Sequence, residues 1–116
     1  MKGKFLDFAG SGLTPTVLVT RTASSTQTQG QGAISSTAIA LIVQYSTVAN
    51  ALDTCTLPTA AVGRQVLVRN DGAATLQVFP ASGANFVGLA ANAPTTIPAG
   101  DSWLFVGLSA TVWGIW

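Results

Sequence analysis

The sequence predicts an all-β domain, an antiparallel β-sandwich or barrel that is jelly-roll-like, with an extended N-terminal arm. In residues 57–116, short apolar runs recur at a spacing of roughly 8–12 residues, which is typical of such folds. Gly, Pro, Asn or Asp lies between nearly every two of these runs, where tight turns need such residues. A chain of 116 residues also suits one domain with a modest core. We therefore expect a single β domain over residues 13–116 and an arm over residues 1–12.

The expected arm combines charged, apolar and glycine residues. They are Lys2, Lys4, Phe5, Leu6, Phe8, Gly10 and Gly12. The glycines separate the apolar side chains from the first strand, so the arm either tucks under its own domain or docks on a neighbouring molecule. Because these side chains are too apolar to be left in water, we expect the residues from Lys2 to Phe8 to take part in assembly. Asp7 interrupts the apolar run, so we expect no signal peptide and synthesis in the cytoplasm.

The first strand is expected at residues 16–21, where Val17 and Val19 alternate with Leu18 and Thr20. Residues 22–37 follow as a stretch rich in Ser, Thr, Gln and Gly, without charge or apolar periodicity. Long unstructured runs are uncommon inside compact domains. We therefore expect an extended excursion at 22–37, either a hairpin or an arm paired with another subunit.

Further strands are expected at residues 39–43, 51–57, 65–69 and 75–79. Asn70, Asp71 and Gly72 between the last two predict a β-hairpin with Gly72 at positive φ. Val66 and Val68 are expected to share one sheet face, opposite Leu67, so that both faces carry apolar residues.

The C-terminal part contains a partial echo and the three tryptophans. Residues 80–89 and 98–108 both contain a Pro/Gly turn followed by Phe-Val-Gly-Leu, which indicates either a true repeat or similar hairpins that use the same turn chemistry. Trp103 and Trp113 are expected to anchor the core because Trp offers the largest apolar area. Trp116 is expected at a subunit seam, and a sugar platform is the alternative for whichever face is left unburied.

Charge is scarce, and this excludes some partners. Charged residues make up 8% of the chain and the mean hydropathy is +0.49, so a lone domain of this size is short of polar surface. We therefore expect an obligate oligomer. Five dispersed basic residues and a net charge of +1 do not favour nucleic-acid binding. No apolar run approaches the 18 or more residues of a membrane span.

The residue types that carry catalysis are nearly missing. The chain has no His and no Glu, and its four acids, all Asp, are spread along it. Asp71 and Asp101 are expected to be turn residues. Cys55 is the single cysteine, so we expect a small buried side chain rather than a disulfide or a metal ligand. We expect no catalytic residue, no cofactor and no metal, and therefore no enzyme.

Residues 57–116 also resemble a module that is common in tailed-phage structural proteins. The matching positions are Leu57-Pro58, Gly63-Arg64, Asn70 to Gly72, Val78 to Gly83, Leu89 to Asn92, Pro98 to Ser102 and Trp113. The resemblance covers about half of the chain. It implies a capsid decoration (cement) protein, a head fibre or a tail-associated part, assembled as a trimer of β-sandwich or barrel subunits.

The resemblance and the composition together lead to three functional expectations. The first is a homotrimeric cement protein on the virion, bound to the major capsid protein, with Lys2, Lys4, Phe5, Leu6 and Phe8 in capsid docking. Weak docking contacts repeated in many copies would add up through avidity. The second is a head- or tail-fibre tip that binds a host glycan through Trp or Tyr45 faces. The third is a cellular adhesion or carbohydrate-binding module. The lack of a collagen-like or coiled-coil stalk favours a compact cap over a long fibre.

Overall fold

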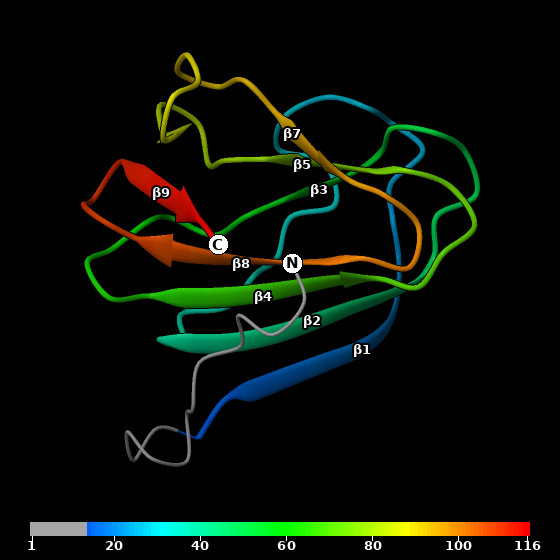
Figure 1. The fold of residues 1–116 in the computed structure, drawn as a ribbon, viewed down its shortest axis with the longest axis horizontal. Helices are drawn as coiled ribbons and strands as arrows, with labels where there is room; N and C mark the ends of the chain where they lie inside the picture. Colours follow the sequence, from blue (N-terminus) through cyan, green and yellow to red (C-terminus); the bar gives the residue numbers. More distant parts are fainter. Residues whose placement is uncertain (1–13) are drawn as a thin grey trace.

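The computed structural model describes residues 14–116, and this part of the chain contains strands and turns but no helix (Figure 1). The strands are β1 (Thr16–Thr22), β2 (Ala40–Thr47), β3 (Asp53–Thr56), β4 (Gln65–Asn70), β5 (Leu76–Phe79), β6 (Asn85–Phe86), β7 (Thr95–Ile97), β8 (Ser102–Gly107) and β9 (Val112–Ile115). The predicted all-β class is confirmed for these residues.

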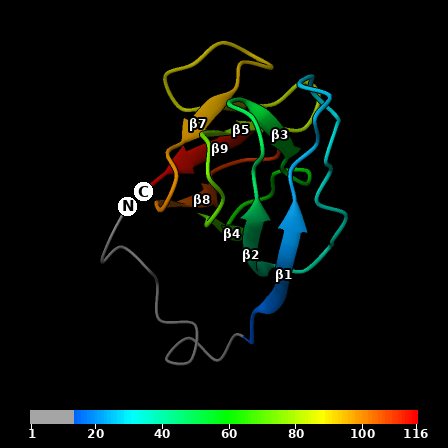
Figure 2. The same cartoon turned by 90° about the vertical axis from the view of Figure 1, so that its right-hand side faces the viewer.

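The strands form two sheets that enclose one core. A large sheet has the order β1-β2-β4-β8-β9-β6, and a small sheet has the order β3-β5-β7. Figure 2 shows β3, β5 and β7 gathered above β1, β2, β4 and β8. The core includes Leu41 and Val66 from the large sheet and Cys55 and Val78 from the small one. The side chains between the sheets therefore hold the two layers together.

The first half of the chain winds as a parallel coil that visits the two sheets in turn. β1, β2 and β4 are parallel neighbours in the large sheet, and β3 and β5 are parallel neighbours in the small one. Thr16 pairs with Leu41 and Ala40 pairs with Gln65, an offset of 25 residues in both cases (41 minus 16, and 65 minus 40). Each turn of the coil thus places the next strand directly beside the last, as in a solenoid.

The second half of the chain reverses direction. β8 runs antiparallel to β4, β7 runs antiparallel to β5, and β9 returns beside β8. β6 then pairs in parallel with β9. Four of the seven pairings are therefore parallel, and the antiparallel arrangement expected from the sequence is wrong for those four. Apolar runs mark where strands lie, but they are the same for a coil and for a hairpin.

The predicted hairpin at Asn70-Asp71-Gly72 is wrong. β4 and β5 belong to different sheets, so the turn carries the chain from one layer to the other. Asn70 is buried and organises this crossing: its side-chain amide donates to the carbonyls of Ala74 and Ile97, and its Oδ1 accepts from the Gly72 N–H. Gly72 does not have the positive φ that the hairpin would require.

Gly72 is needed for a different reason, which is close packing. A Cβ at this position would overlap the backbone nitrogen of buried Val48 and would lie 2.6 Å from its Cβ. We expect Gly72→Val to lower the free energy of unfolding by about 1–3 kcal/mol, because overpacking forces the backbone apart. Chemical denaturation measures this value. Ala73→Val, at the exposed neighbouring position, is the control and should change stability little. Equal effects of the two variants would contradict the packing argument.

The polar stretch 22–37 lies along β3 of its own chain. Ser24 bridges Thr54 and Ala33 bridges Thr56, so the excursion is bonded to the small sheet at two places. The Thr56 hydroxyl accepts from the Gly30 N–H and donates to the Gln31 carbonyl. Hydrogen bonds therefore hold this segment together with the burial of Ala23 and Ile34, which both belong to the core.

Candidate functional site

The acids of the described chain accept structural hydrogen bonds and do not converge. Asp53 accepts from the Gln27 side-chain amide and the Asn50 N–H, and Asp71 accepts from Arg69 and Gln44. Asp101 accepts from the Ser102 N–H. The hydrogen bonds from Gln44 and Arg69 hold the pKa of Asp71 below its ordinary value. No group of three potential metal-ligating residues occurs among residues 14–116, and this part has no pocket for a small ligand.

A row of apolar side chains crosses the face of the large sheet that is turned away from the core. Strand register places Val17 beside Ile42, Ile42 beside Leu67, and Leu67 beside Leu104. Leu104 exchanges both backbone hydrogen bonds with Trp116, the residue that follows β9 in the chain, so Trp116 continues the row beside β8. We call Val17, Ile42, Leu67, Leu104 and Trp116 the outer row. Their sequence neighbours Leu41, Val66 and Phe105 point into the core, so the outer row faces outward.

The outer row is covered unequally. Val17 is 53% exposed and Trp116 is 44% exposed, while Ile42 and Leu67 are half-buried and Leu104 is buried. Two further exposed apolar side chains, Val19 and Leu108, lie near its two ends. The row is continuous in strand register but is exposed mainly at its two ends, and exposed apolar side chains of this kind are candidates for contact with another molecule. The outer row is therefore the candidate functional site of the described chain.

Trp116 lies flat along this face because Gly114 leaves room for it. A Cβ on Gly114 would overlap the six-membered ring of Trp116 and would lie 3.3 Å from Cδ1 of Leu108. The predicted role of Trp116 at a subunit seam agrees with this exposed position but remains untested. The other predicted assembly residues, Lys2, Lys4, Phe5, Leu6 and Phe8, lie outside the described residues.

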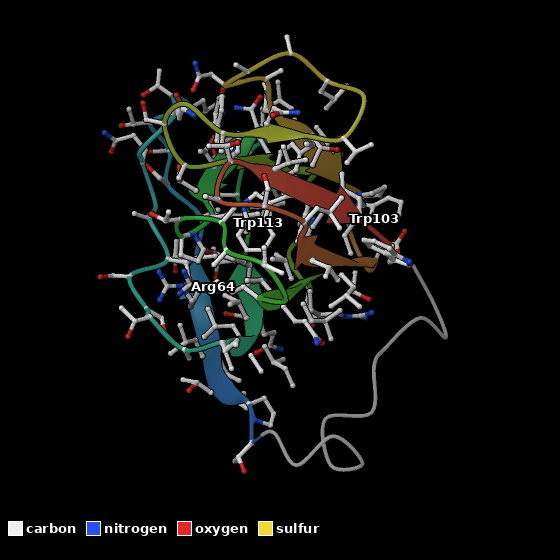
Figure 3. All side chains as sticks on the ribbon, turned by 90° about the vertical axis from the view of Figure 1, so that its left-hand side faces the viewer. Arg64, Trp103 and Trp113 are labelled. Atoms are coloured by element: carbon white, nitrogen blue, oxygen red, sulfur yellow. The ribbon has the colours of Figure 1, made fainter. Side chains whose placement is uncertain are left out.

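The remaining aromatic predictions have clear outcomes. Trp113 is fully buried, and Trp103 packs partly buried against the core while its indole N–H donates to the Thr96 carbonyl at 3.0 Å. Figure 3 shows Trp113 in the middle of the molecule and Trp103 near its edge. The core roles predicted for both are confirmed. Tyr45 is also fully buried, so its ring offers no platform for a sugar.

A buried arginine forms a structural centre that the sequence did not reveal. The Arg64 guanidinium, labelled in Figure 3, donates to three backbone carbonyls: Nε to Ala38 at 3.1 Å, NH1 to Thr59 at 2.7 Å, and NH2 to Ser36. Burial lowers the pKa of Arg64. Ser36 and Ala38 precede β2 and Thr59 precedes β4, so Arg64 joins successive turns of the coil. The one sequence signal that could have indicated this role of Arg64 is its position as a single basic residue in an apolar turn.

Two asparagines of the phage-like pattern are also structural. Asn70 caps the crossing between the sheets, as described above. Asn92 adopts a φ of 67°, and its Oδ1 accepts from the Gly83 N–H at 2.7 Å and from the Gln29 amide at 3.1 Å. Gln29 also donates to the Pro80 carbonyl. These residues therefore tie loops together rather than presenting side chains for chemistry.

Buried Cys55 and Tyr45 form a cluster with half-buried Arg21. The Arg21 guanidinium carbon lies 5.8 Å from the centre of the Tyr45 ring, within cation–π range. Burial raises the pKa of the Cys55 thiol from 9.0 to about 12. Burial, reinforced by the neighbouring Cys55, also raises the pKa of Tyr45 above its ordinary value. The buried thiol is free, as the sequence predicted.

This cluster predicts a loss of stability in alkaline solution. An unfolded Cys55 loses its proton near pH 9 and the folded one near pH 12, so the unfolded state gains stability between these values, by up to about 1.4 kcal/mol per pH unit. The free energy of unfolding should therefore fall as the pH rises from about 9 to about 12. Denaturant titrations over this range measure it. In the Cys55→Ala variant the free energy of unfolding should fall less steeply with pH. An equal slope in the variant and the unmodified chain would contradict the raised pKa of Cys55 as the cause.

Residues 14–116 form no helix, and therefore none that could span a membrane. Comparisons with protein-family models, with curated proteins and with solved structures found no match to this chain.

Proposed function

We propose that this chain is a structural subunit without enzymatic activity, a homotrimeric cement protein that decorates a phage capsid and binds its major capsid protein. The observation that carries the proposal is the outer row, an apolar stripe on a chain with only 8% charged residues. Such a surface suits permanent contact with other proteins. The acids of the described chain accept structural hydrogen bonds and lie apart from one another, which supports a structural role over a catalytic one.

The fold supports the same role. We take the finer fold to be a short β-solenoid closed by antiparallel strands, in place of a jelly roll. Its layers are held by a continuous core, the Arg64 bonds and the Asn70 cap. A compact body of this kind has no stalk and suits a cap on a capsid surface. Its location would be the exterior of the virion.

Binding to particles tests the proposal directly. Purified protein is mixed with capsids that lack it, the particles are sedimented, and cryo-electron microscopy locates the added density. We expect saturable binding at repeated positions of the capsid lattice. By light scattering, the free protein should have three times the mass of one chain. The capsids come from the phage whose genome encodes the chain. If the protein does not bind them, the cement function is refuted. Binding to a defined oligosaccharide on a glycan array would favour the fibre-tip alternative, with exposed Trp116 as its platform.

The arm is tested by deletion. We propose that Lys2, Lys4, Phe5, Leu6 and Phe8 dock on the capsid, each apolar side chain contributing roughly 1.5–3 kcal/mol when buried. Deleting residues 1–12 should leave the β circular-dichroism spectrum unchanged and weaken capsid binding or trimer stability. A truncated chain that does not fold would identify the arm as part of the subunit and would overturn this role.

A further inference from the structure

We propose that the outer edge of β1, from Thr16 to Val19, binds an extended segment of the major capsid protein, which joins the large sheet as one more strand. We call Thr16 to Val19 the open edge. The inference rests on the proposed cement function and names the surface of the chain that the capsid protein contacts. β1 stands at one end of the strand order of the large sheet, and in Figure 1 it forms the lower border of that sheet, below β2.

The other edges of the two sheets are closed by the chain itself. The loop after β6 folds back on that strand, because the Leu89 N–H donates to the Phe86 carbonyl. The excursion at 22–37 lies along β3. At β7, a strand of three residues, the Trp103 indole donates to the Thr96 carbonyl. Within residues 14–116, β1 is therefore the one sheet edge whose outer side has no partner.

The backbone of the open edge determines what kind of partner fits it. An unpaired edge presents N–H and C=O groups in alternation, and the partner whose own groups match them is another extended strand. Proteins that avoid such pairing place Lys or Pro on the edge or insert a bulge. The open edge contains neither residue. The register of β1 against β2 is regular from Thr16 to Leu18, and the bulge lies beyond it, at Thr20 with a φ of 60°.

The side chains of the open edge favour an uncharged strand. Val17 and Val19 are 53% and 58% exposed, so the neighbouring positions of an added strand suit apolar or β-branched residues. Arg21 is the one charged residue of β1. Its guanidinium carbon lies 5.8 Å from the centre of the Tyr45 ring, so this charge is directed back toward the core. A neutral segment of the capsid protein therefore fits better than a charged one.

A second copy of this chain is a poorer partner for the open edge. Since β1 is the one open edge within residues 14–116, another copy could offer only its own β1. Two identical edges pair around a two-fold axis, which builds dimers and not the proposed trimer. The capsid protein is the other partner that the proposed function requires. The proposed docking residues end at Phe8, eight residues before Thr16 (16 minus 8), so at most about 28 Å of chain separates β1 from the capsid surface.

Backbone hydrogen exchange tests the pairing directly, because an added strand bonds to amide protons that a contact between side chains leaves free. The protein is measured free in solution and bound to capsids that lack it, prepared from the phage whose genome encodes the chain. We expect alternate amides of the open edge to exchange at least about tenfold more slowly on the capsids. The amides of the loops that contain Val62 and Val87 should exchange equally in both states.

Lysine substitutions test the same contact by affinity. Val17→Lys and Val19→Lys place a charge beside the added strand, and both positions are exposed enough for the free subunit to fold. Val62→Lys and Val87→Lys are the matched controls, since these valines are 76% and 58% exposed and lie outside β1. In capsid sedimentation the two β1 variants should bind at least about tenfold more weakly than the controls. Circular dichroism verifies that all four variants fold.

Three other results would overturn the proposal in different ways. If all amides of the open edge are already protected in the free protein, then residues 1–13 or a second copy cover β1. If the protein binds the capsids with unchanged exchange, or if the β1 variants bind as tightly as the controls, the cement function stands and the capsid protein contacts another surface. A protein that does not bind these capsids loses the cement function and this partner together.

Discussion

Arg64→Ala is expected to lower the free energy of unfolding by about 2–4 kcal/mol. The substitution removes buried Arg64 and leaves the carbonyls of Ser36, Ala38 and Thr59 without the donors that now satisfy them. It also separates the segments that lead into β2 and β4, so successive turns of the parallel coil lose their cross-link. Denaturant titration at a fixed protein concentration measures the loss.

Two further variants isolate the cause. Arg64→Lys keeps the positive charge but cannot reach three carbonyls with one ammonium group, so it should recover less than half of the loss. Arg69→Ala is the control, because it removes the neighbouring arginine of β4. The exposed ion pair of Arg69 with Asp71 should contribute less than about 1 kcal/mol to the free energy of unfolding. If Arg64→Ala cost no more than Arg69→Ala, the three carbonyl bonds would not be stabilising the coil.

The positions of the strands could be predicted from the sequence, but their partners could not. Residues 65–69 were expected as a strand, and β4 occupies them with Val66 and Val68 facing the core. Asn70-Asp71-Gly72 suggested a hairpin because these residues tolerate tight turns. In the fold the buried Asn70 amide bonds to Ala74 and Ile97, which lie far apart in sequence. Such a long-range role leaves no local signal.

The coil itself is almost invisible in the sequence. The positions that stack in the large sheet share a preference for aliphatic side chains rather than a repeated sequence motif, as in Leu18, Val43 and Val68. The visible echo between residues 80–89 and 98–108 does not repeat in the structure, because β6 and β8 lie on opposite sides of β9 and run in opposite directions relative to it. The repeating turns of the parallel coil therefore need only a common pattern of burial, and not a common sequence.

The candidate site could be predicted only at one of its ends. Trp116 was expected at a seam because a terminal tryptophan on an unburied face is conspicuous. Leu67 was expected on the face opposite Val66 and Val68, but nothing in the sequence aligned it with Ile42 and Leu104. That alignment depends on the parallel pairing of β2 with β4 and the antiparallel pairing of β4 with β8. Register, and not composition, makes separate apolar residues into one surface.

Trp113→Ala is expected to lower the free energy of unfolding by about 3–5 kcal/mol, since Trp113 is fully buried and the lost ring leaves a cavity between the sheets. A small domain has only about 5–15 kcal/mol in total, so the variant should be close to unfolding. Trp113→Phe is the matched control. The indole Nε1 is buried and has no hydrogen-bond partner among the described residues, so a ring without that N–H should cost less than about 2 kcal/mol. Denaturant titration compares the two variants. A phenylalanine variant as unstable as the alanine one would mean that a bond to Nε1, and not the volume of the ring, stabilises β9.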